Sequence, residues 1–97
     1  MDEETLTRMT SLYAGRHKAF LATRHPDVYA EKEKAGTLEA HLTKRGREAA
    51  EYYLTLEAQM EERAKAIANT REREAYIGGI PSTVAELVRE ELVHAWP

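Results

Sequence analysis

Glu91 and His94 stand three residues apart, a spacing that helical bundles use to hold metal ions through a carboxylate and an imidazole. Such a site needs a second copy of the pair and further glutamates on facing helices, and this 97-residue chain has no second copy. The two serines, Ser11 and Ser82, have no visible catalytic base, and cysteine is absent. We therefore expect neither an enzyme nor a metal site.

The remaining histidines, His17, His25 and His41, have no ligand spacing among themselves, so we expect surface or partly packed groups. The segment Gly78–Thr83 could present backbone N–H groups to a phosphate. It lacks the lysine and the full glycine pattern of a nucleotide loop, and a simple turn explains it better. We expect no cofactor.

Basic residues are concentrated in the amino half of the chain. Residues 16–47 hold eight Lys or Arg against four Asp or Glu, whereas residues 48–97 hold five against ten. If the chain folds back after its first helix, these cations form one patch suited to phosphate contacts. The candidates for nucleic-acid binding are Arg16, Lys18, Arg24, Lys44 and Arg47.

Two other interpretations of this charge remain open. Most charge surpluses of this size are only a solvated helix face. Alternatively, Arg16 and Arg45 pair with glutamates, because an arginine in an apolar stripe is often buried against a carboxylate.

These side chains must be positioned by helices, and the longest is predicted over residues 38–70. No proline interrupts it, and its apolar residues recur every three or four positions, which favours a packed bundle over a coiled coil. Arg45 occupies the one polar position of the stripe, and Gly46 is where the helix could break. The stripe consists of Leu38, Leu42, Ala49, Tyr53, Leu56, Met60, Ala64 and Ile67.

Three further helices are predicted near residues 4–23, 27–35 and 83–95. Pro26 opens the second, and Gly36 ends it as a left-handed cap, after which Thr37 caps the long helix. Gly78–Pro81 is predicted to be a turn, followed by a capping box of Thr83 and Glu86. The last helix is expected to turn Val84, Leu87, Val88, Leu92 and Ala95 inward and to close with Trp96.

We therefore expect one all-α domain over residues 1–97, a small helical bundle of about four helices built on one long central helix. The hydrophobic fraction is 42%, but fifteen of these residues are alanine, so the chain has few large apolar side chains to bury. We therefore expect a homodimer through part of the Leu38–Ile67 stripe, which would bury more apolar surface.

The amino terminus is acidic where a signal peptide is basic, and no stretch is apolar enough to span a membrane, which predicts a cytoplasmic protein.

A resemblance to a known family adds to this interpretation. The central block of the transposon-encoded TnpV family reads as an arginine, an aromatic-Leu pair, His-Arg-Pro, Leu-Tyr, Ser-Gly-Lys-Leu and a closing Leu. This chain is similar over residues 16–60 and 76–94, with the His-Arg order inverted. The matching residues are Arg16, Phe20-Leu21, Arg24-His25-Pro26, Val28-Tyr29, Gly36-Thr37-Leu38 and His41-Leu42.

The resemblance implies a bacterial mobile element and an accessory role beside a recombinase, with excisionase-like association with DNA. Two hypotheses follow. The first is a non-enzymatic accessory factor that contacts the DNA phosphate backbone through its basic patch. The second is a small helical protein-binding module or inhibitor whose partner meets the acidic carboxyl half.

Overall fold

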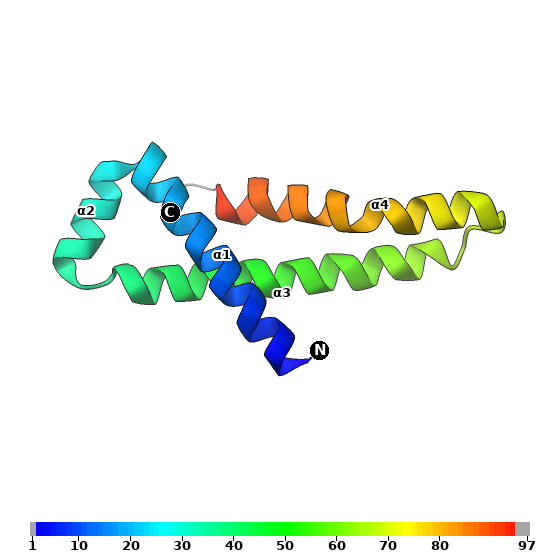
Figure 1. The fold of residues 1–97 in the computed structure, drawn as a ribbon, viewed down its shortest axis with the longest axis horizontal. Helices are drawn as coiled ribbons and strands as arrows, with labels where there is room; N and C mark the ends of the chain where they lie inside the picture. The colour runs from blue at the N-terminus through cyan, green and yellow to red at the C-terminus, as the bar shows by residue number, and fades with distance from the viewer. Residues whose placement is uncertain (1, 95–97) are drawn as a thin grey trace.

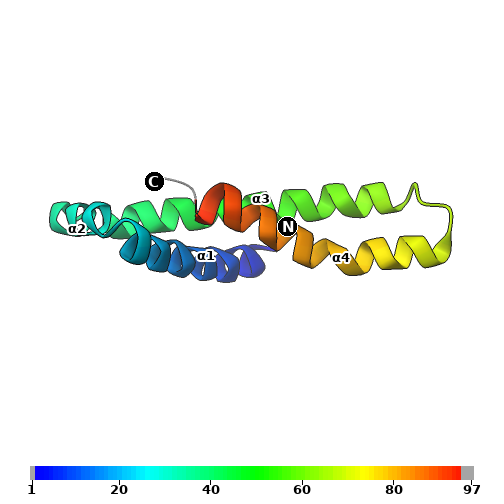
Figure 2. The same ribbon diagram turned by 90° about the horizontal axis from the view of Figure 1, so that it is seen from above.

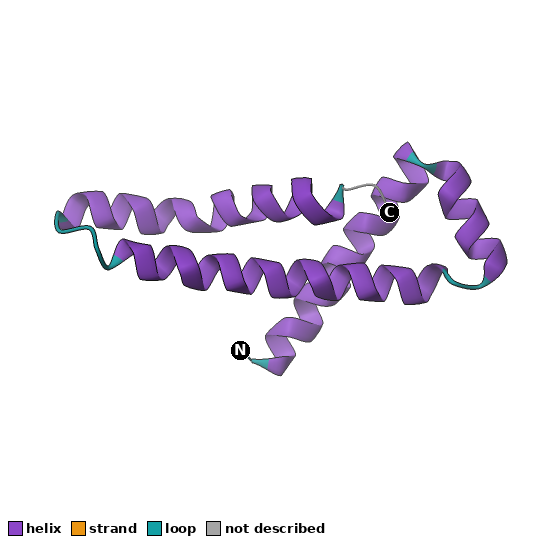
Figure 3. Ribbon diagram, turned by 180° about the vertical axis from the view of Figure 1, so that it is seen from behind, coloured by secondary structure: helices purple, strands orange, loops and turns teal. Residues whose placement is uncertain are grey.

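The structure, a computed structural model, describes residues 2–94. Within that range it contains four α-helices and no strand (Figure 1, Figure 3), which confirms the predicted all-α bundle. The helices are α1 (Glu3–Arg24), α2 (Pro26–Ala35), α3 (Leu38–Ala64) and α4 (Thr70–Val88), and α4 continues into a π-helical turn, η1 (Arg89–Val93).

The central element is α3, which contacts every other helix. In Figure 1, α4 runs back antiparallel to α3, α1 crosses α3 obliquely beside the end of α4, and α2 joins α1 to α3 at one end. The far half of the α3–α4 pair extends well past α1 (Figure 2). The radius of gyration is consequently 16.1 Å, against about 12–13 Å for a compact domain of this length. The molecule measures 55 × 27 × 13 Å, so it is long and thin.

The ends of the first two helices follow local chemistry. The Asp2 carboxylate accepts a hydrogen bond from the Glu4 backbone N–H and another from the Thr5 hydroxyl, which caps α1. Gly36 has φ of 75°, as predicted for a left-handed cap. The Thr37 hydroxyl donates back to the Lys32 carbonyl and makes no side-chain cap for α3, so that part of the prediction is wrong.

Gly46 is a contact point and not a break, because α3 runs through it without interruption. A Cβ added at Gly46 would lie 2.5 Å from the Thr10 carbonyl oxygen and 2.9 Å from the Ala14 backbone nitrogen. The missing side chain therefore lets the backbone of α1 approach that of α3.

The carboxyl-terminal half differs from the sequence prediction. The long helix ends at Ala64 and not near residue 70, since the next three residues form tight i→i+3 hydrogen bonds. Asn69 then caps α4, its side-chain oxygen accepting from the Glu72 N–H at 3.0 Å. The predicted turn at Gly78–Pro81 and the predicted cap at Thr83 both lie inside α4 and are wrong.

The reason is an apolar stripe that continues through the Gly-Gly-Ile-Pro segment. Tyr76, Ile80, Val84 and Val88 are spaced four residues apart, and the last three are fully buried in the core that α3 shares with α1 and α4. Pro81 removes one backbone donor from the helix, but the burial on either side of it outweighs that loss. Of the other predicted inward positions, Leu87 and Leu92 are half-buried, and Ala95 and Trp96 lie outside the described residues.

A second cluster fills the corner where α1, α2 and α3 meet. Leu21, Leu38 and Leu42 are buried there, and Phe20, Val28 and Tyr29 pack against them. This corner fixes the carboxyl end of α1, which carries the candidate site.

The Gly46 contact leads to a stability prediction. Gly46→Ala should destabilise the protein by about 1–3 kcal/mol, because the clash with the α1 backbone exceeds the roughly 1 kcal/mol that alanine gains in a helix. Gly15→Ala is the matched control, since Gly15 is exposed in α1 and an added Cβ there meets nothing within 4 Å. That variant should be stabilised by about 0.5–1 kcal/mol. Urea unfolding followed by circular dichroism measures both, and equal stabilisation would show that the helices do not cross closely.

Candidate functional site

Two of the five predicted phosphate-binding residues meet in one hollow. Arg16 and Arg24 line a hollow of about 700 Å³ on the carboxyl half of α1. Arg89 and His94, from the far end of the chain, line the same hollow, and Phe20 belongs to its wall. Three guanidinium groups and an imidazole therefore surround one open space.

The three arginines are available to a ligand. Within residues 2–94, none of them forms an ion pair with a carboxylate. Arg16 places its guanidinium carbon 5.5 Å from the centre of the Tyr13 ring, a cation–π contact that leaves its hydrogen-bond donors free to bind an anion. Planar guanidinium groups of this kind hold phosphate or carboxylate oxygens in pairs of hydrogen bonds.

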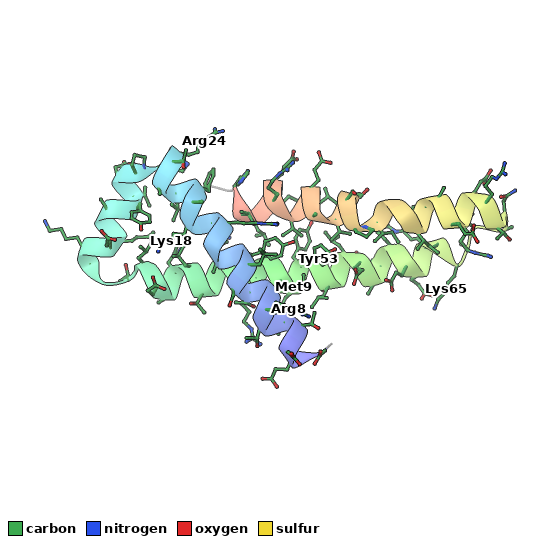
Figure 4. All side chains as sticks on the ribbon, in the orientation of Figure 1. Arg8, Met9, Lys18, Arg24, Tyr53 and Lys65 are labelled. Carbon is green, nitrogen blue, oxygen red and sulfur yellow. The ribbon has the colours of Figure 1, made fainter. Side chains whose placement is uncertain are left out.

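The other three candidates lie elsewhere, so the structure divides the predicted patch. Lys18 faces the α2–α3 corner, where Glu33 and Glu39 share its hollow, while Arg24 lies at the end of α1 (Figure 4). Lys44 lines a separate hollow near the start of α3, and Arg47 forms an exposed ion pair with Glu51 at 2.8 Å.

The alternative of arginine–glutamate pairing is confirmed for one of its two residues. Arg45 is largely buried, and its Nη1 lies 3.8 Å from a Glu48 carboxylate oxygen. Its Nε is buried with no hydrogen-bond partner. Arg16 lies over Tyr13, and no glutamate within residues 2–94 pairs with it.

All four histidines of the chain gather beside this hollow, which the sequence analysis did not foresee. The Phe20 ring stacks on His94 with ring centres 5.0 Å apart, stacks on His17 at 5.9 Å, and meets His25 edge-on at 5.2 Å. His41 lies against His17 from α3.

His17 is completely buried, so the expectation of a surface or partly packed group is wrong. Its Nδ1 lies 2.7 Å from the Val93 carbonyl oxygen, and its Nε2 lies 3.2 Å from the His41 Nε2. A carbonyl only accepts, so the Nδ1 of His17 carries a proton. When the His17 ring is neutral, its Nε2 accepts from the N–H of His41, and this arrangement allows both imidazoles to be neutral.

The surroundings favour that neutral state. Burial lowers the pKa of His17 below its ordinary value, and the hydrogen bond to Val93 opposes this only in part; the nearby charges of Arg45, His94 and Lys32 lower the pKa further. Burial also lowers the pKa of His41, with Lys32, His17 and Arg45 adding to the effect and Glu48 opposing it.

Glu91 and His94 do not act together. The Tyr52 hydroxyl donates a hydrogen bond to the Glu91 carboxylate, whereas the His94 ring stacks on Phe20. Among residues 2–94 no three His, Asp or Glu side chains are grouped so that they could hold a metal ion.

Comparisons with known proteins add no assignment: no protein-family model matches the sequence, and neither curated proteins nor solved structures give a match. In the part of the chain that the structure describes, no helix has both the length and the apolar content needed to cross a membrane.

The histidine pair predicts a pH dependence of stability. Because the pKa values of His17 and His41 are lowered by folding, the unfolded chain takes up protons below about pH 6.5 while the folded chain resists them. The free energy of unfolding should therefore decrease as the pH falls, by up to about 1.4 kcal/mol per pH unit for each histidine, until the folded pKa is reached.

Urea unfolding between pH 7.5 and 5.5 measures this dependence. His41→Gln, which cannot titrate, should have a visibly shallower profile than the parent. A parent protein that is equally stable at both ends of the range would contradict the neutral pair.

Proposed function

We propose that this chain is a non-enzymatic accessory protein that binds the phosphate backbone of nucleic acid through Arg16, Arg24 and Arg89. The observation that carries the proposal is their convergence, with His94, around one hollow, without a carboxylate partner among residues 2–94. Unpaired arginines attract phosphates and release the counterions that surround a polyanion, which is the main source of backbone affinity.

The rest of the surface supports contact with phosphates over recognition of bases. The chain contains one asparagine, Asn69, and one glutamine, Gln59, both far from the hollow along the sequence. Amide side chains are the usual readers of adenine, so their scarcity favours a protein that binds DNA with little sequence preference of its own.

The resemblance to the TnpV family agrees with this site. Arg16, Phe20 and Arg24, three residues of the resembling block, line the hollow. On that basis we propose that the protein acts in the cytoplasm of a bacterium, as an accessory factor of a mobile element beside a recombinase.

We also propose that the chain forms a homodimer through the far half of the α3–α4 pair. Within one chain, Leu38, Leu42, Ala49 and Ala64 of the stripe are already buried. Its remaining members, Tyr53, Leu56, Met60 and Ile67, are only half-buried. Tyr53 contacts Tyr13 of α1, and the other three follow it towards the end of the α3–α4 pair that extends past α1 (Figure 1). A two-helix hairpin buries little apolar surface alone, so a second copy would complete its core.

The alternative function is a small module that binds another protein. The carboxyl half of the chain, residues 48–97, holds ten Asp or Glu against five Lys or Arg, and Ile77 is exposed on the far half of the α3–α4 pair. This alternative becomes the leading one if the protein does not bind nucleic acid.

Salt dependence tests the DNA proposal. Duplex DNA titrated by fluorescence anisotropy should bind less tightly as salt rises, and Arg24→Gln with Arg89→Gln should flatten the slope of log affinity against log salt by about two units, at roughly 0.9 per phosphate contact. Lys44→Gln with Arg47→Gln removes the same charge outside the hollow and should change the slope much less.

Absence of a complex at about 10 μM protein and about 50 mM salt would reject the DNA proposal. If the two double variants change the slope equally, DNA contacts the basic residues of the whole amino half and not the hollow in particular.

Light scattering tests the dimer. At tens of micromolar, a concentration at which a dimer of about micromolar Kd is largely formed, the parent should have the mass of two chains. Ile77→Glu should shift it towards one chain, because it puts a charge on the uncovered part of the α3–α4 pair. Leu12→Glu is the matched control, since Leu12 is 49% exposed on α1 and Ile77 is 47% exposed. A parent of single-chain mass would disprove the dimer.

A further inference from the structure

The buried His17 links three elements directly, namely α1, which carries it, α3 and η1. From α1 it reaches His41 on α3 with one ring nitrogen and the Val93 carbonyl of η1 with the other. It is therefore a direct link between the carboxyl end of the described chain and the α1–α3 crossing.

The turn that His17 holds also carries half of the arginine hollow. Arg89 is the first residue of η1, and His94 follows its last residue. The His94 backbone N–H donates to the Arg89 carbonyl at 2.7 Å, so these two residues are tied to each other as well as to Val93. Any movement of the Val93 carbonyl away from His17 would carry Arg89 and His94 with it.

We propose that the His17–His41 pair is an acid-sensitive latch, which holds η1 against α1 at neutral pH and releases Arg89 and His94 from the hollow when both rings are protonated. The effect of the latch on DNA rests on the function proposed above. The movement itself does not depend on that function.

The number of protons that the pair can hold follows from its geometry. With one added proton, one ring still offers an unprotonated Nε2 to the N–H of the other, so the 3.2 Å hydrogen bond persists. With two added protons, both Nε2 atoms carry hydrogen and face each other as donors. Two positive rings cannot remain at that distance in a buried site, so the second proton drives the rings apart. The hydrogen bond to Val93 itself favours a protonated His17, so η1 is released where the charged His17 ring leaves its buried position and this bond breaks with it.

Most of the charged groups around the His17–His41 pair oppose its protonation. Arg45 on α3, Lys32 on α2 and His94 after η1 face His17, and Lys32 and Arg45 also face His41. Among residues 2–94, Glu48 on α3 is the acid that opposes them at His41, and it already lies near Arg45. Within this range a doubly protonated pair therefore has little negative charge nearby to stabilise it in place.

Opening of the His17–His41 pair lowers the apparent affinity for DNA, because it lowers the fraction of molecules whose η1 is in place to bind. If acid reduces the fraction of molecules with η1 in place to a tenth, the apparent Kd for DNA rises about tenfold. A loss of affinity at low pH supports the latch only where the rest of the fold stays intact, so the fold is measured on the same samples.

The experiment compares three proteins, the parent, His41→Gln and His25→Gln, in DNA titrations at pH 7.5 and 5.0 at constant ionic strength. Glutamine at 41 keeps an N–H for His17 but cannot become charged. His25 contacts Phe20 but has no part in the His17–His41 hydrogen bond, so His25→Gln is the matched control. Parent and His25→Gln should lose about tenfold in affinity at pH 5.0, and His41→Gln less than about threefold.

Amide hydrogen exchange on the same samples separates the latch from the DNA proposal. At pH 5.0, after correction for intrinsic rates, the segment 89–94 should lose protection in the parent and keep it in His41→Gln. Ala49 and Ala50, buried in α3, should stay protected in every protein.

The two measurements together decide separately on the latch and on the DNA function. If no DNA binds but segment 89–94 opens in the parent and in His25→Gln and not in His41→Gln, the latch stands and the DNA function fails. If DNA binds and segment 89–94 keeps its protection at pH 5.0, the function stands and the latch is disproved. Simultaneous loss of protection at Ala49 and Ala50 would also disprove it, since the protein would then be unfolding as a whole.

Discussion

The close crossing of α1 over α3 at Gly46 is the constraint on which the rest of the structure depends. Without a Cβ at this position, the backbone of α3 lies against Thr10 and Ala14 of α1. His17 stands about one helical turn beyond Ala14, and His41 stands five residues before Gly46, so the crossing brings the two rings together. A larger residue at 46 would separate the helices, and the bonds from His17 to His41 and Val93 would be lost with the contact.

The sequence predicts the parts of the fold that local chemistry decides. The apolar stripe of α3, the proline that opens α2 and the left-handed Gly36 are all read correctly from spacing and residue type. The carboxyl half is not, because Gly78, Gly79 and Pro81 signal a turn as strongly as any short segment can. The longer pattern of Ile80, Val84 and Val88 outweighs them, since burial against α3 rewards a continuous helix. Asn69 with Glu72 was the signal that could have located the start of α4.

The candidate site was harder to predict because it is assembled from the two ends of the chain. Arg16 and Arg24 were identified from the charge of the amino half, but Arg89 lies in the acidic half and has no basic neighbours in the sequence. The role of His17 depends on a contact with a residue 76 positions away. Its place beside Tyr13 and Leu21 on the inward side of α1 was visible in the sequence, yet spacing alone could not identify the group that it would meet.

The charge close to the hollow, and not the net charge of the chain, decides whether this acidic chain can bind a polyanion. Three arginines line the hollow, and the acids that stand closest to them in the sequence are Glu90 and Glu91, which directly follow Arg89. At physiological salt, charges separated by more than about 8 Å are largely screened from each other, so the distant acids barely weaken phosphate binding at the hollow. The far end of the α3–α4 pair does not line the hollow, so the proposed DNA contact and the proposed dimer contact need not compete for the same surface.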